Sequence, residues 1–282
     1  MVRWKWVGPL ALGATLIACS DSQTDESAGT TTAGSSTGTT TSTTGAGGGS
    51  STGTTTSSSG GGSTTTTTSQ GGGLPAYATF HLNYTQNKDW TKCAERDFVV
   101  FDLLETPGAD FAQCKGMGAK MLCYFSSQYE DWRADAGDFG ALTGPLDGWP
   151  GEEWVDPNDP ANLAVMVARL DVAVTKGCDG VDVDNIDHAG HETYVSTIFQ
   201  EARDRGLLVS QKNAIEKIDL FWNLVDLYQN EQCQEYDECA PYAGLGRPVY
   251  NIEYTPCQTL PYLYSNRKDV NAMDAWEEAC AP

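Results

Sequence analysis

Short apolar segments alternate with amphipathic ones along residues 74–282, and this alternation is the feature that most restricts the fold. Eight apolar segments have the length and composition of β-strands, at 77–82, 98–103, 120–126, 180–184, 207–212, 224–230, 248–254 and 262–265. Strands separated by helical patterns are typical of an α/β domain with a parallel sheet. Eight of them favour a closed (β/α)8 barrel of the TIM type over an open sheet, although residues 74–282 are near the small end of its usual size range.

The helical segments carry recognisable start and stop signals. A helix is predicted at 160–176, where Asp159 suits the N-cap, Pro160 suits the first turn and Gly177 suits the C-terminal stop. Further helices are expected at 192–205 and at 269–280, and the last of these would close the barrel.

The first 18 residues have the pattern of a lipoprotein signal peptide. Arg3 and Lys5 precede an uncharged apolar run at 6–17, which ends in Leu-Ile-Ala-Cys at Cys19. The run is too short to span a bilayer, which takes ~20 residues. We expect cleavage before Cys19, lipidation of its thiol and export to the bacterial cell envelope, at the outer membrane or cell surface. An ordinary signal peptide and an uncleaved anchor are the alternatives.

Residues 19–73 are predicted to form a disordered tether after the lipidated cysteine. Ser, Thr and Gly dominate this segment, and it lacks the apolar residues that could offset the entropy of ordering. A coil of this length has an end-to-end distance of roughly 40 Å. The domain organisation is therefore a signal peptide at 1–18, a tether at 19–73 and a barrel at 74–282.

The charge of the predicted barrel restricts its partners. Two basic and three acidic residues precede residue 74, which leaves 15 basic and 35 acidic residues in the barrel. This excess of negative charge argues against nucleic acids and anionic glycans, since it would repel both. It is compatible with a cationic or neutral ligand, or with a surface that only keeps an exported protein soluble. We expect a monomer that contacts the membrane through its lipid anchor alone.

The cysteine content suits an oxidising compartment. Eight of the nine cysteines lie in the barrel, at positions 93, 114, 123, 178, 233, 239, 257 and 280. We expect Cys233 to pair with Cys239 across a short loop, and Cys257 to pair with Cys280, which would hold the C-terminal helix. No C-x-x-C pair occurs, so a zinc site is not expected.

Polar residues end the predicted strands, where the active site of such a barrel lies. They are Asp102, Tyr124, Asp182, Asp184, Lys212, Asn213, Glu231, Glu253 and Tyr254, with Asp187 shortly after the fourth strand. Because side chains alternate along a strand, Asp182 and Asp184 should both point into the barrel. A calcium loop does not fit, because Asp187 stands where that loop needs a glycine.

Several of these residues also have structural interpretations. Asp182 could orient Lys212 or bind backbone groups, Asp102 could bind backbone at its strand end, and Asp187 could cap the next segment. Aromatic residues in the segments that follow the strands, including Trp132, Trp149 and Trp154, suit a glycan cleft because sugar C–H faces pack on rings, although core packing is the alternative.

At these residues the sequence resembles glycoside hydrolase family 114, the endo-α-1,4-polygalactosaminidase family of (β/α)-barrel proteins. The matching stretches are CYFS (123–126), YEDWRAD (129–135), GWPGEEWVD (148–156), GCDGVDVDNID (177–187), QKN (211–213), NEQC (230–233) and VYNIEY (249–254). The resemblance implies an endo-acting hydrolase of α-1,4-linked galactosamine polymers. Some of these are deacetylated and cationic, so the acidic domain would attract them. After Glu253 the chain is compact, which leaves the last strand least well defined.

Our mechanistic hypothesis is a retaining double displacement. Asp184, at the end of the fourth strand, is the candidate nucleophile, and Glu231, at the end of the sixth, is the candidate acid/base. Asp102, Lys212, Asn213 and Glu253 would orient the substrate or the catalytic pair, and no cofactor is needed. The alternatives are a hydrolase of another α-galactoside or amino-sugar glycan, and a non-catalytic glycan-binding barrel on the cell surface.

Overall fold

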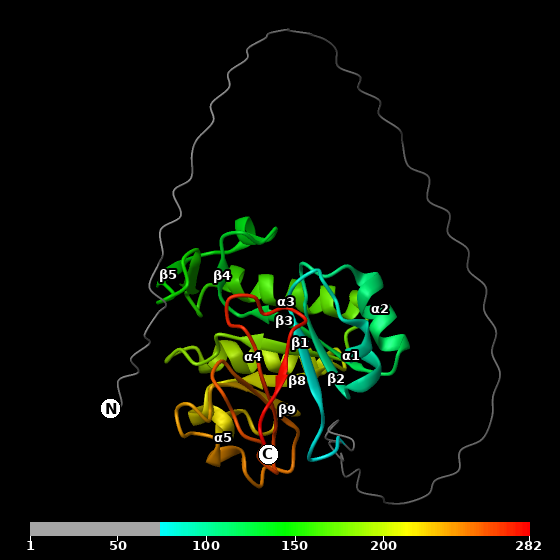
Figure 1. Ribbon diagram of the computed structural model, residues 1–282. Coiled ribbons are helices and arrows are strands. Elements are labelled where there is room, and N and C mark those ends of the chain that lie inside the picture. The colour runs from blue at the N-terminus through cyan, green and yellow to red at the C-terminus, as the bar shows by residue number, and fades with distance from the viewer. Residues whose placement is uncertain (1–73) are drawn as a thin grey trace, which may run out of the picture. The chain divides into compact units, whose positions relative to one another are not determined.

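The computed structural model describes residues 74–282, whose nine-stranded sheet curls around an inner core (Figure 1). The predicted signal peptide, Cys19 and the tether lie outside these residues. The strands, in their order across the sheet, are β1 (Phe80–Asn83), β2 (Phe98–Asp102), β3 (Lys120–Ser126), β7 (Gly180–Asp184), β8 (Leu208–Lys212), β9 (Leu227–Glu231), β10 (Val249–Glu253), β11 (Tyr264–Arg267) and β12 (Glu278–Ala279). The first eight pair in parallel, and β12 is antiparallel to β11. All eight predicted strands are therefore present, in the predicted order.

Helices cover the outer face of the first half of the sheet. They are α1 (Trp90–Glu95), α2 (Gly108–Gly116), α3 (Pro160–Lys176) and α4 (Glu192–Asp204), followed by the short α5 (Ile218–Phe221) and the 3-10 turns η1 (Ala136–Asp138), η2 (Ile215–Lys217) and η3 (Ala240–Tyr242). The predicted ends of α3 are confirmed. The Asp159 side chain accepts a hydrogen bond from the backbone N–H of Ala161, and Gly177 has a φ of 79°, the left-handed conformation that ends a helix.

An antiparallel sheet is inserted between β3 and α3 (Figure 1). It contains β4 (Tyr129–Glu130), β6 (Glu152–Val155) and β5 (Leu142–Pro145), in that order. No strand is predicted for this segment from its sequence, because its strands are short and separated by glycine and proline. The insertion lies at the carboxyl ends of the parallel strands, next to the predicted site.

Two apolar cores lie on opposite faces of the main sheet. On the outer face, Val181 and Val183 of β7 belong to the larger core, together with buried residues of α3 and α4. On the inner face, the Phe80 ring stacks between the rings of Phe98 and Tyr250, with centroids 4.9 and 5.1 Å away. The alternation predicted for β7 is thus confirmed, with its valines toward the helices and its aspartates toward the interior.

The junction between β1 and β11 differs from a barrel closed by backbone pairing. Within residues 74–282, no strand ladder joins β1 to β11 or β12. The C-terminal segment bridges this junction instead, since Glu277 accepts from Arg96 at 2.7 Å and lies 2.7 Å from Nδ1 of His81. The backbone N–H of Tyr84 also donates to the Met273 carbonyl at 2.9 Å. The strand number and order of the predicted barrel are confirmed, but the sheet is curled and its backbone pairing does not close within the described residues.

The prediction of a helix at 269–280 is wrong. The segment consists of turns followed by β12, and two aspartates explain why. Asp269 accepts from the N–H of Asn271, and Asp274 accepts from the N–H of Trp276, both at 2.9 Å. Such local bonds from aspartate to the backbone compete with helix formation. The ammonium of Lys268 then fixes the turn by donating to the carbonyl oxygens of Asp274 and Trp276.

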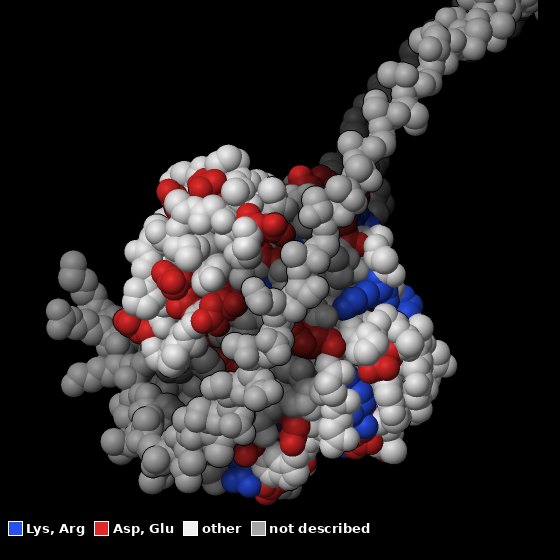
Figure 2. All heavy atoms as spheres, turned by 90° about the horizontal axis from the view of Figure 1, so that it is seen from above, with Lys and Arg blue, Asp and Glu red and all other residues white. Residues whose placement is uncertain are grey.

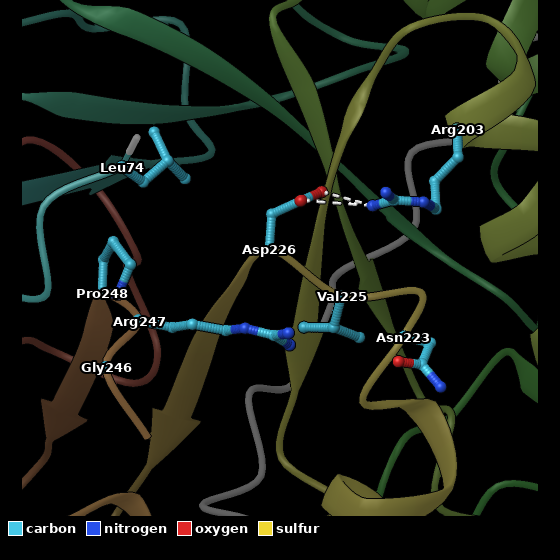
Figure 3. A pocket seen from close by; sticks show the side chains of 8 residues that line it. All are labelled: Leu74, Arg203, Asn223, Val225, Asp226, Gly246, Arg247 and Pro248. Carbon is cyan, nitrogen blue, oxygen red and sulfur yellow. Dashed lines mark hydrogen bonds and ion pairs between the residues drawn. The ribbon is translucent and has the colours of Figure 1, made fainter. Parts of the chain in front are cut away.

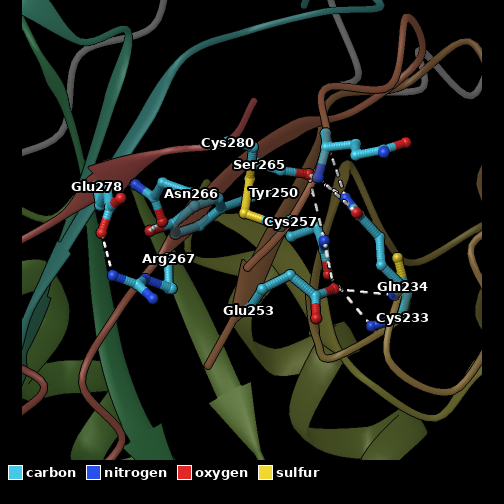
Figure 4. The surroundings of a disulfide bond; sticks show 12 residues. Cys233, Gln234, Tyr250, Glu253, Cys257, Ser265, Asn266, Arg267, Glu278 and Cys280 are labelled. Atoms are coloured by element: carbon cyan, nitrogen blue, oxygen red, sulfur yellow. Dashed lines mark hydrogen bonds and ion pairs between the residues drawn. A yellow bond between two sulfur atoms is a disulfide. The ribbon is translucent and has the colours of Figure 1, made fainter. Parts of the chain in front are cut away.

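Four disulfides join all eight cysteines of the described residues. They are Cys93–Cys114, Cys123–Cys178, Cys233–Cys239 and Cys257–Cys280. Both pairs predicted from the sequence are confirmed. The Cys257–Cys280 bond holds the C-terminal strand, not a helix, beside β10 and β11 (Figure 4). No helix within residues 74–282 is both long enough and apolar enough to cross a membrane.

Candidate active site

Polar side chains gather where the central parallel strands end. Asp184 ends β7, Lys212 ends β8 and Glu231 ends β9, and these three strands are neighbours in the sheet. Parallel pairing brings their carboxyl ends to one edge, which is the location of active sites in barrels of this type. Three of the predicted site residues therefore meet in one place.

Asp184 is buried and accepts three hydrogen bonds. The hydroxyl of Tyr124 donates to Oδ2 at 2.9 Å, and the ammonium of Lys212 donates to the same oxygen at 2.7 Å. The backbone N–H of Asn185 donates to Oδ1 at 2.8 Å. These donors fix the orientation of the carboxylate.

Glu231 has a similar set of donors from different elements. The hydroxyl of Tyr254 donates to Oε1 at 2.6 Å, and Nζ of Lys212 lies 3.2 Å from Oε2. The side-chain oxygen of Asn213 accepts a hydrogen bond from the backbone N–H of Glu231 at 2.8 Å. The side-chain nitrogen of Asn213 lies 3.4 Å from Oε2 of Glu231. Asn213 has a φ of 51°, a conformation that asparagine tolerates and that turns its side chain back toward β9.

Lys212 links the two carboxylates. Its burial opposes the positive charge, but the charges of Asp184 and Glu231 outweigh burial and raise the pKa of the ammonium above its ordinary value. Because one nitrogen contacts an oxygen of each carboxylate, these two oxygens are no further apart than the sum of the two contact distances. That sum is below the ~6.5 to 9.5 Å that separates the carboxyl groups of inverting glycosidases.

Asp182 is two residues before Asp184 on β7 and therefore lies deeper inside the curled sheet. It is fully buried, and within the described residues neither of its carboxylate oxygens has a hydrogen-bond partner. Ser210 is opposite it in the β7–β8 ladder, but its hydroxyl is outside hydrogen-bonding geometry. Burial raises the pKa of Asp182 to about 7. In this position the carboxyl group is below the surface that a glycan could contact.

The carboxylates of Asp102 and Glu253 accept hydrogen bonds from other groups of the protein. Asp102 accepts two hydrogen bonds from the guanidinium of Arg133, at 3.0 and 2.8 Å, and two more from backbone N–H groups. Glu253 accepts from the N–H of Gln234 and from the Asn251 amide, both at 2.8 Å, and burial raises its pKa (Figure 4). Both carboxylates therefore hold neighbouring segments in place in this structure.

The remaining predicted residues lie at the surface. Asp187 is exposed, and Trp132 and Trp149 are 52% and 44% exposed. Trp149 lines a hollow of about 500 Å³ that also includes Glu152. A second hollow, of about 650 Å³, is lined by Tyr254 and the exposed ring of Trp276. Since the hydroxyl of Tyr254 donates to Glu231, this hollow adjoins the cluster at the strand ends.

The family model for glycoside-hydrolase family GH114 matches residues 62–281. This chain belongs to family GH114. The predicted resemblance is thus confirmed over the whole domain that carries the site.

Solved structures agree with this assignment of the GH114 domain. Ega3 from Aspergillus fumigatus, solved in complex with galactosamine, is 27% identical with a TM-score of 0.67, over 73% of this chain and 96% of that one. The glycoside hydrolase domain of PelA from Pseudomonas aeruginosa is 15% identical with a TM-score of 0.59, over 74% of this chain and all of that one. The second likeness concerns the fold alone. No curated protein sequence matches the chain significantly.

Two residues of this GH114 site, Tyr84 and Glu152, were not predicted from the sequence, whereas Trp154 was predicted as one of several aromatic residues that suit a glycan cleft. Tyr84 follows β1, and its ring stacks on Tyr124 with centroids 3.9 Å apart, beneath Asp184. Glu152 and Trp154 come from the inserted sheet, and the Trp154 ring stacks on His188 at 4.3 Å. The position of Tyr84 directly after an apolar strand was a usable signal. Glu152 and Trp154 lie in a matching stretch, but nothing in the sequence indicates that the insertion folds over the site.

The surface of the GH114 domain near the strand ends is acidic. Seen from the top of Figure 1, Asp and Glu side chains are more abundant than Lys and Arg (Figure 2). Within residues 74–282 no group of His, Cys, Asp and Glu residues has the arrangement of a metal site.

Another hollow, of about 230 Å³, lies at the opposite end of the strands, where β9 and β10 begin (Figure 3). Asp226 forms an ion pair there with Arg203, at 3.1 Å. The guanidinium of Arg247 lies 3.7 Å from the centre of the Trp222 ring and donates to the Trp222 carbonyl. Each arginine thus has a partner within the protein, and residues at this end of a barrel usually serve stability.

Proposed function

We propose that this GH114 domain is an endo-acting hydrolase of α-1,4-linked galactosamine polysaccharide, with a retaining mechanism. Asp184 is the nucleophile and Glu231 is the general acid and base. The observation that carries the proposal is the bridge formed by Lys212, which contacts both carboxylates at 2.7 and 3.2 Å. It limits the distance between the two contacting oxygens to less than the separation typical of inverting enzymes, which supports a retaining mechanism.

The two carboxylates have different tasks in this mechanism. Glu231 donates a proton to the glycosidic oxygen while Asp184 attacks the anomeric carbon, so the carbon–oxygen bond breaks and a glycosyl-enzyme forms. Glu231 then takes a proton from water, which attacks the same carbon and releases Asp184. Lys212 contacts both carboxylates, so its charge can stabilise the negative charge that moves between them during the reaction.

Three features support a galactosamine polymer as substrate. The chain is a member of family GH114, and it is 27% identical to Ega3, which was solved with galactosamine. The acidic charge of the domain favours a cationic glycan, as a deacetylated galactosamine polymer is. The hollows beside Tyr254 and Glu152 give an extended chain room beyond the catalytic pair, which suits cleavage within a polymer.

We also propose that lipidated Cys19 and the Ser/Thr/Gly-rich tether hold the enzyme at the bacterial cell envelope. The support for this is the sequence pattern alone, because these residues lie outside the described structure. A tether of ~40 Å would let the barrel reach polymer beyond the lipid headgroups.

Digestion of a panel of purified polysaccharides tests the proposed substrate. The panel contains α-1,4-galactosamine polymer before and after N-acetylation, together with other α-galactosides and amino-sugar glycans. Mass spectrometry of the products should show internal cleavage of the galactosamine polymer into oligomers of several lengths. Cleavage of another glycan only would reassign the substrate, and tight binding without any cleavage would indicate a glycan-binding barrel.

A further inference from the structure

Glu152 brings a carboxyl group from the inserted sheet to the side of the nucleophile. It is the first residue of β6 and is only 9% exposed. Its Oε2 lies 3.4 Å from Nδ2 of Asn185, whose backbone N–H donates to Asp184. The Asn185 amide also donates to Ser126 at 2.9 Å, which fixes it between β3 and the insertion. Asn185 therefore links Glu152 to the proposed nucleophile. No step of the proposed mechanism uses Glu152.

The charges that face Glu152 are mostly negative or already paired. Glu130 lies opposite it in the β4–β6 ladder, and Asp184 approaches from β7. The nearby cations are Lys212, which contacts Asp184 and Glu231, and Arg133, which contacts Asp102 and Glu130. Within residues 74–282 Glu152 forms no ion pair of its own. Burial, followed by the charges of Glu130 and Asp184, raises its pKa to about 8.

A buried carboxyl group among other carboxylates is costly unless a cation satisfies it. No cation of the described residues forms an ion pair with Glu152, so a positively charged group of the ligand could occupy this place. Trp154 supplies the neighbouring surface, because residues two apart on a strand share a face. Its half-buried ring stacks on His188, which belongs to the same loop after β7 as Asn185.

We infer that Glu152 recognises the ammonium group of a galactosamine unit bound beside Asp184, and so selects deacetylated over N-acetylated sugar. This inference rests on the proposed function and adds a specificity residue to it. An ammonium forms a charge-assisted hydrogen bond with a carboxylate. A neutral acetamide is bulkier and cannot form an ion pair, so it gains less from Glu152.

Ammonium binding should also release a proton. With a pKa of about 8, Glu152 carries a proton at pH 7 in the free protein. A cation within contact distance favours the carboxylate and lowers this pKa, so up to one proton leaves at pH 7. Well above pH 8 the group is already ionised and the release should disappear.

Binding is measured in a variant that cleaves the polymer very slowly, so that recognition can be separated from catalysis. Glu231→Gln is the suitable background, because it retains Asp184 as a neighbour of Glu152. The probes are an α-1,4-linked galactosamine oligomer and its fully N-acetylated counterpart, titrated by calorimetry in buffers of different ionisation enthalpy. We expect Glu152→Gln to reduce the preference for the free amine by about tenfold or more. Proton release should be lost in the same variant.

Glu201→Gln is the matched control, because it also removes one carboxylate, which contacts Arg205 at the end of the same helix and lines neither hollow beside the site. It should leave both the preference and the proton release unchanged. If Glu152→Gln keeps the full preference, Glu152 only supports Asn185 and the inference is overturned. Equal affinity of the Glu231→Gln protein with intact Glu152 for the free amine and the N-acetylated oligomer also overturns it, whether or not Glu152→Gln folds. Failure of the parent protein to cleave any galactosamine polymer would instead refute the proposed function.

Discussion

The ammonium of Lys212 lies 2.7 Å from the carboxylate of Asp184, and the two residues end neighbouring strands of the main sheet. Lys212→Met keeps the length of the side chain and removes the charge. We expect kcat to fall by about 10²-fold, because a fixed charge at the reacting centre is lost and the carboxylates repel one another. Steady-state kinetics on the cleaved polymer would measure this. Lys115→Met, at an exposed position, should have little effect. An unchanged kcat in Lys212→Met would remove Lys212 from the mechanism.

Glu277 should contribute strongly to stability, because it joins the C-terminal segment to β1 and α1. Burial opposes its charge, but hydrogen bonds from His81, Lys92 and Arg96 outweigh burial and lower its pKa to about 2. Glu277→Gln should lower the free energy of unfolding by about 1–3 kcal/mol at neutral pH, since the half-buried Lys92 and Arg96 lose their charge-assisted hydrogen bonds to its carboxylate. Urea denaturation would measure the loss. The exposed Glu278→Gln is the control.

The effect of Glu277 should depend on pH in a defined direction. Its pKa is lower in the folded protein than the ordinary value of 4.5, so its stabilisation is complete above about pH 4.5 and is lost as the pH falls toward 2. The difference in unfolding free energy between the parent and Glu277→Gln should shrink through this interval. A difference that stays constant from pH 7 to pH 3 would show that the ion pairs of Glu277 contribute no stability.

Ionic strength should affect cleavage if the acidic domain attracts a cationic polymer. We expect kcat/KM on deacetylated substrate to fall as salt rises, because charges beyond ~10 Å are screened at 0.1 M. The N-acetylated polymer is the matched control, and its cleavage should vary much less with salt. Equal salt dependence for the two polymers would leave the acidic surface as a determinant of solubility only.

The anchoring proposal concerns residues before the described domain. Cys19→Ala removes the thiol that would carry lipid, so the protein should move from a detergent-extracted membrane fraction to a soluble fraction. Fractionation followed by immunoblotting would measure this distribution. If the two proteins distribute alike, Cys19 is not the membrane anchor.

The sequence predicted the parts of the fold that depend on local patterns. Apolar strands with polar ends placed Asp184, Lys212 and Glu231 together, since parallel strands end at one edge of the sheet. The ends of α3 were predictable because Asp159 and Gly177 act on adjacent backbone groups. Each of these predictions needed only the residues next to the feature.

Features that depend on distant contacts could not be predicted in this way. Glu277 closes the junction beside β1 through His81, which is 196 residues away in the sequence. The environment of Glu152 combines Glu130 and Asp184, from different elements, so its raised pKa arises only after folding. The segment at 269–280 has a helical apolar pattern, but hydrogen bonds from Asp269 and Asp274 to the backbone stabilise turns instead.

The assignment of the catalytic pair is tested by Asp184→Asn and Glu231→Gln. Both substitutions preserve shape and most hydrogen bonds, so folding and glycan binding should survive. Hydrolysis of the polymer should fall by at least about 10²- to 10⁴-fold in each variant, as measured by release of reducing ends. Asp187→Asn, at an exposed position after β7, is a suitable control and should retain most of the activity.

The two variants should also differ in kind, which separates the nucleophile from the acid/base. With a substrate that has an activated leaving group, Glu231→Gln should still form the glycosyl-enzyme, because such a group needs little protonation. Turnover then stalls for lack of a base, and added azide should restore it. Asp184→Asn should form no intermediate with any leaving group, and azide should give no product that retains the anomeric configuration. Detection of the intermediate by mass spectrometry of the intact protein distinguishes these cases. If both variants cleave the polymer at near-parent rates, another carboxylate such as Asp182 or Glu253 carries the reaction.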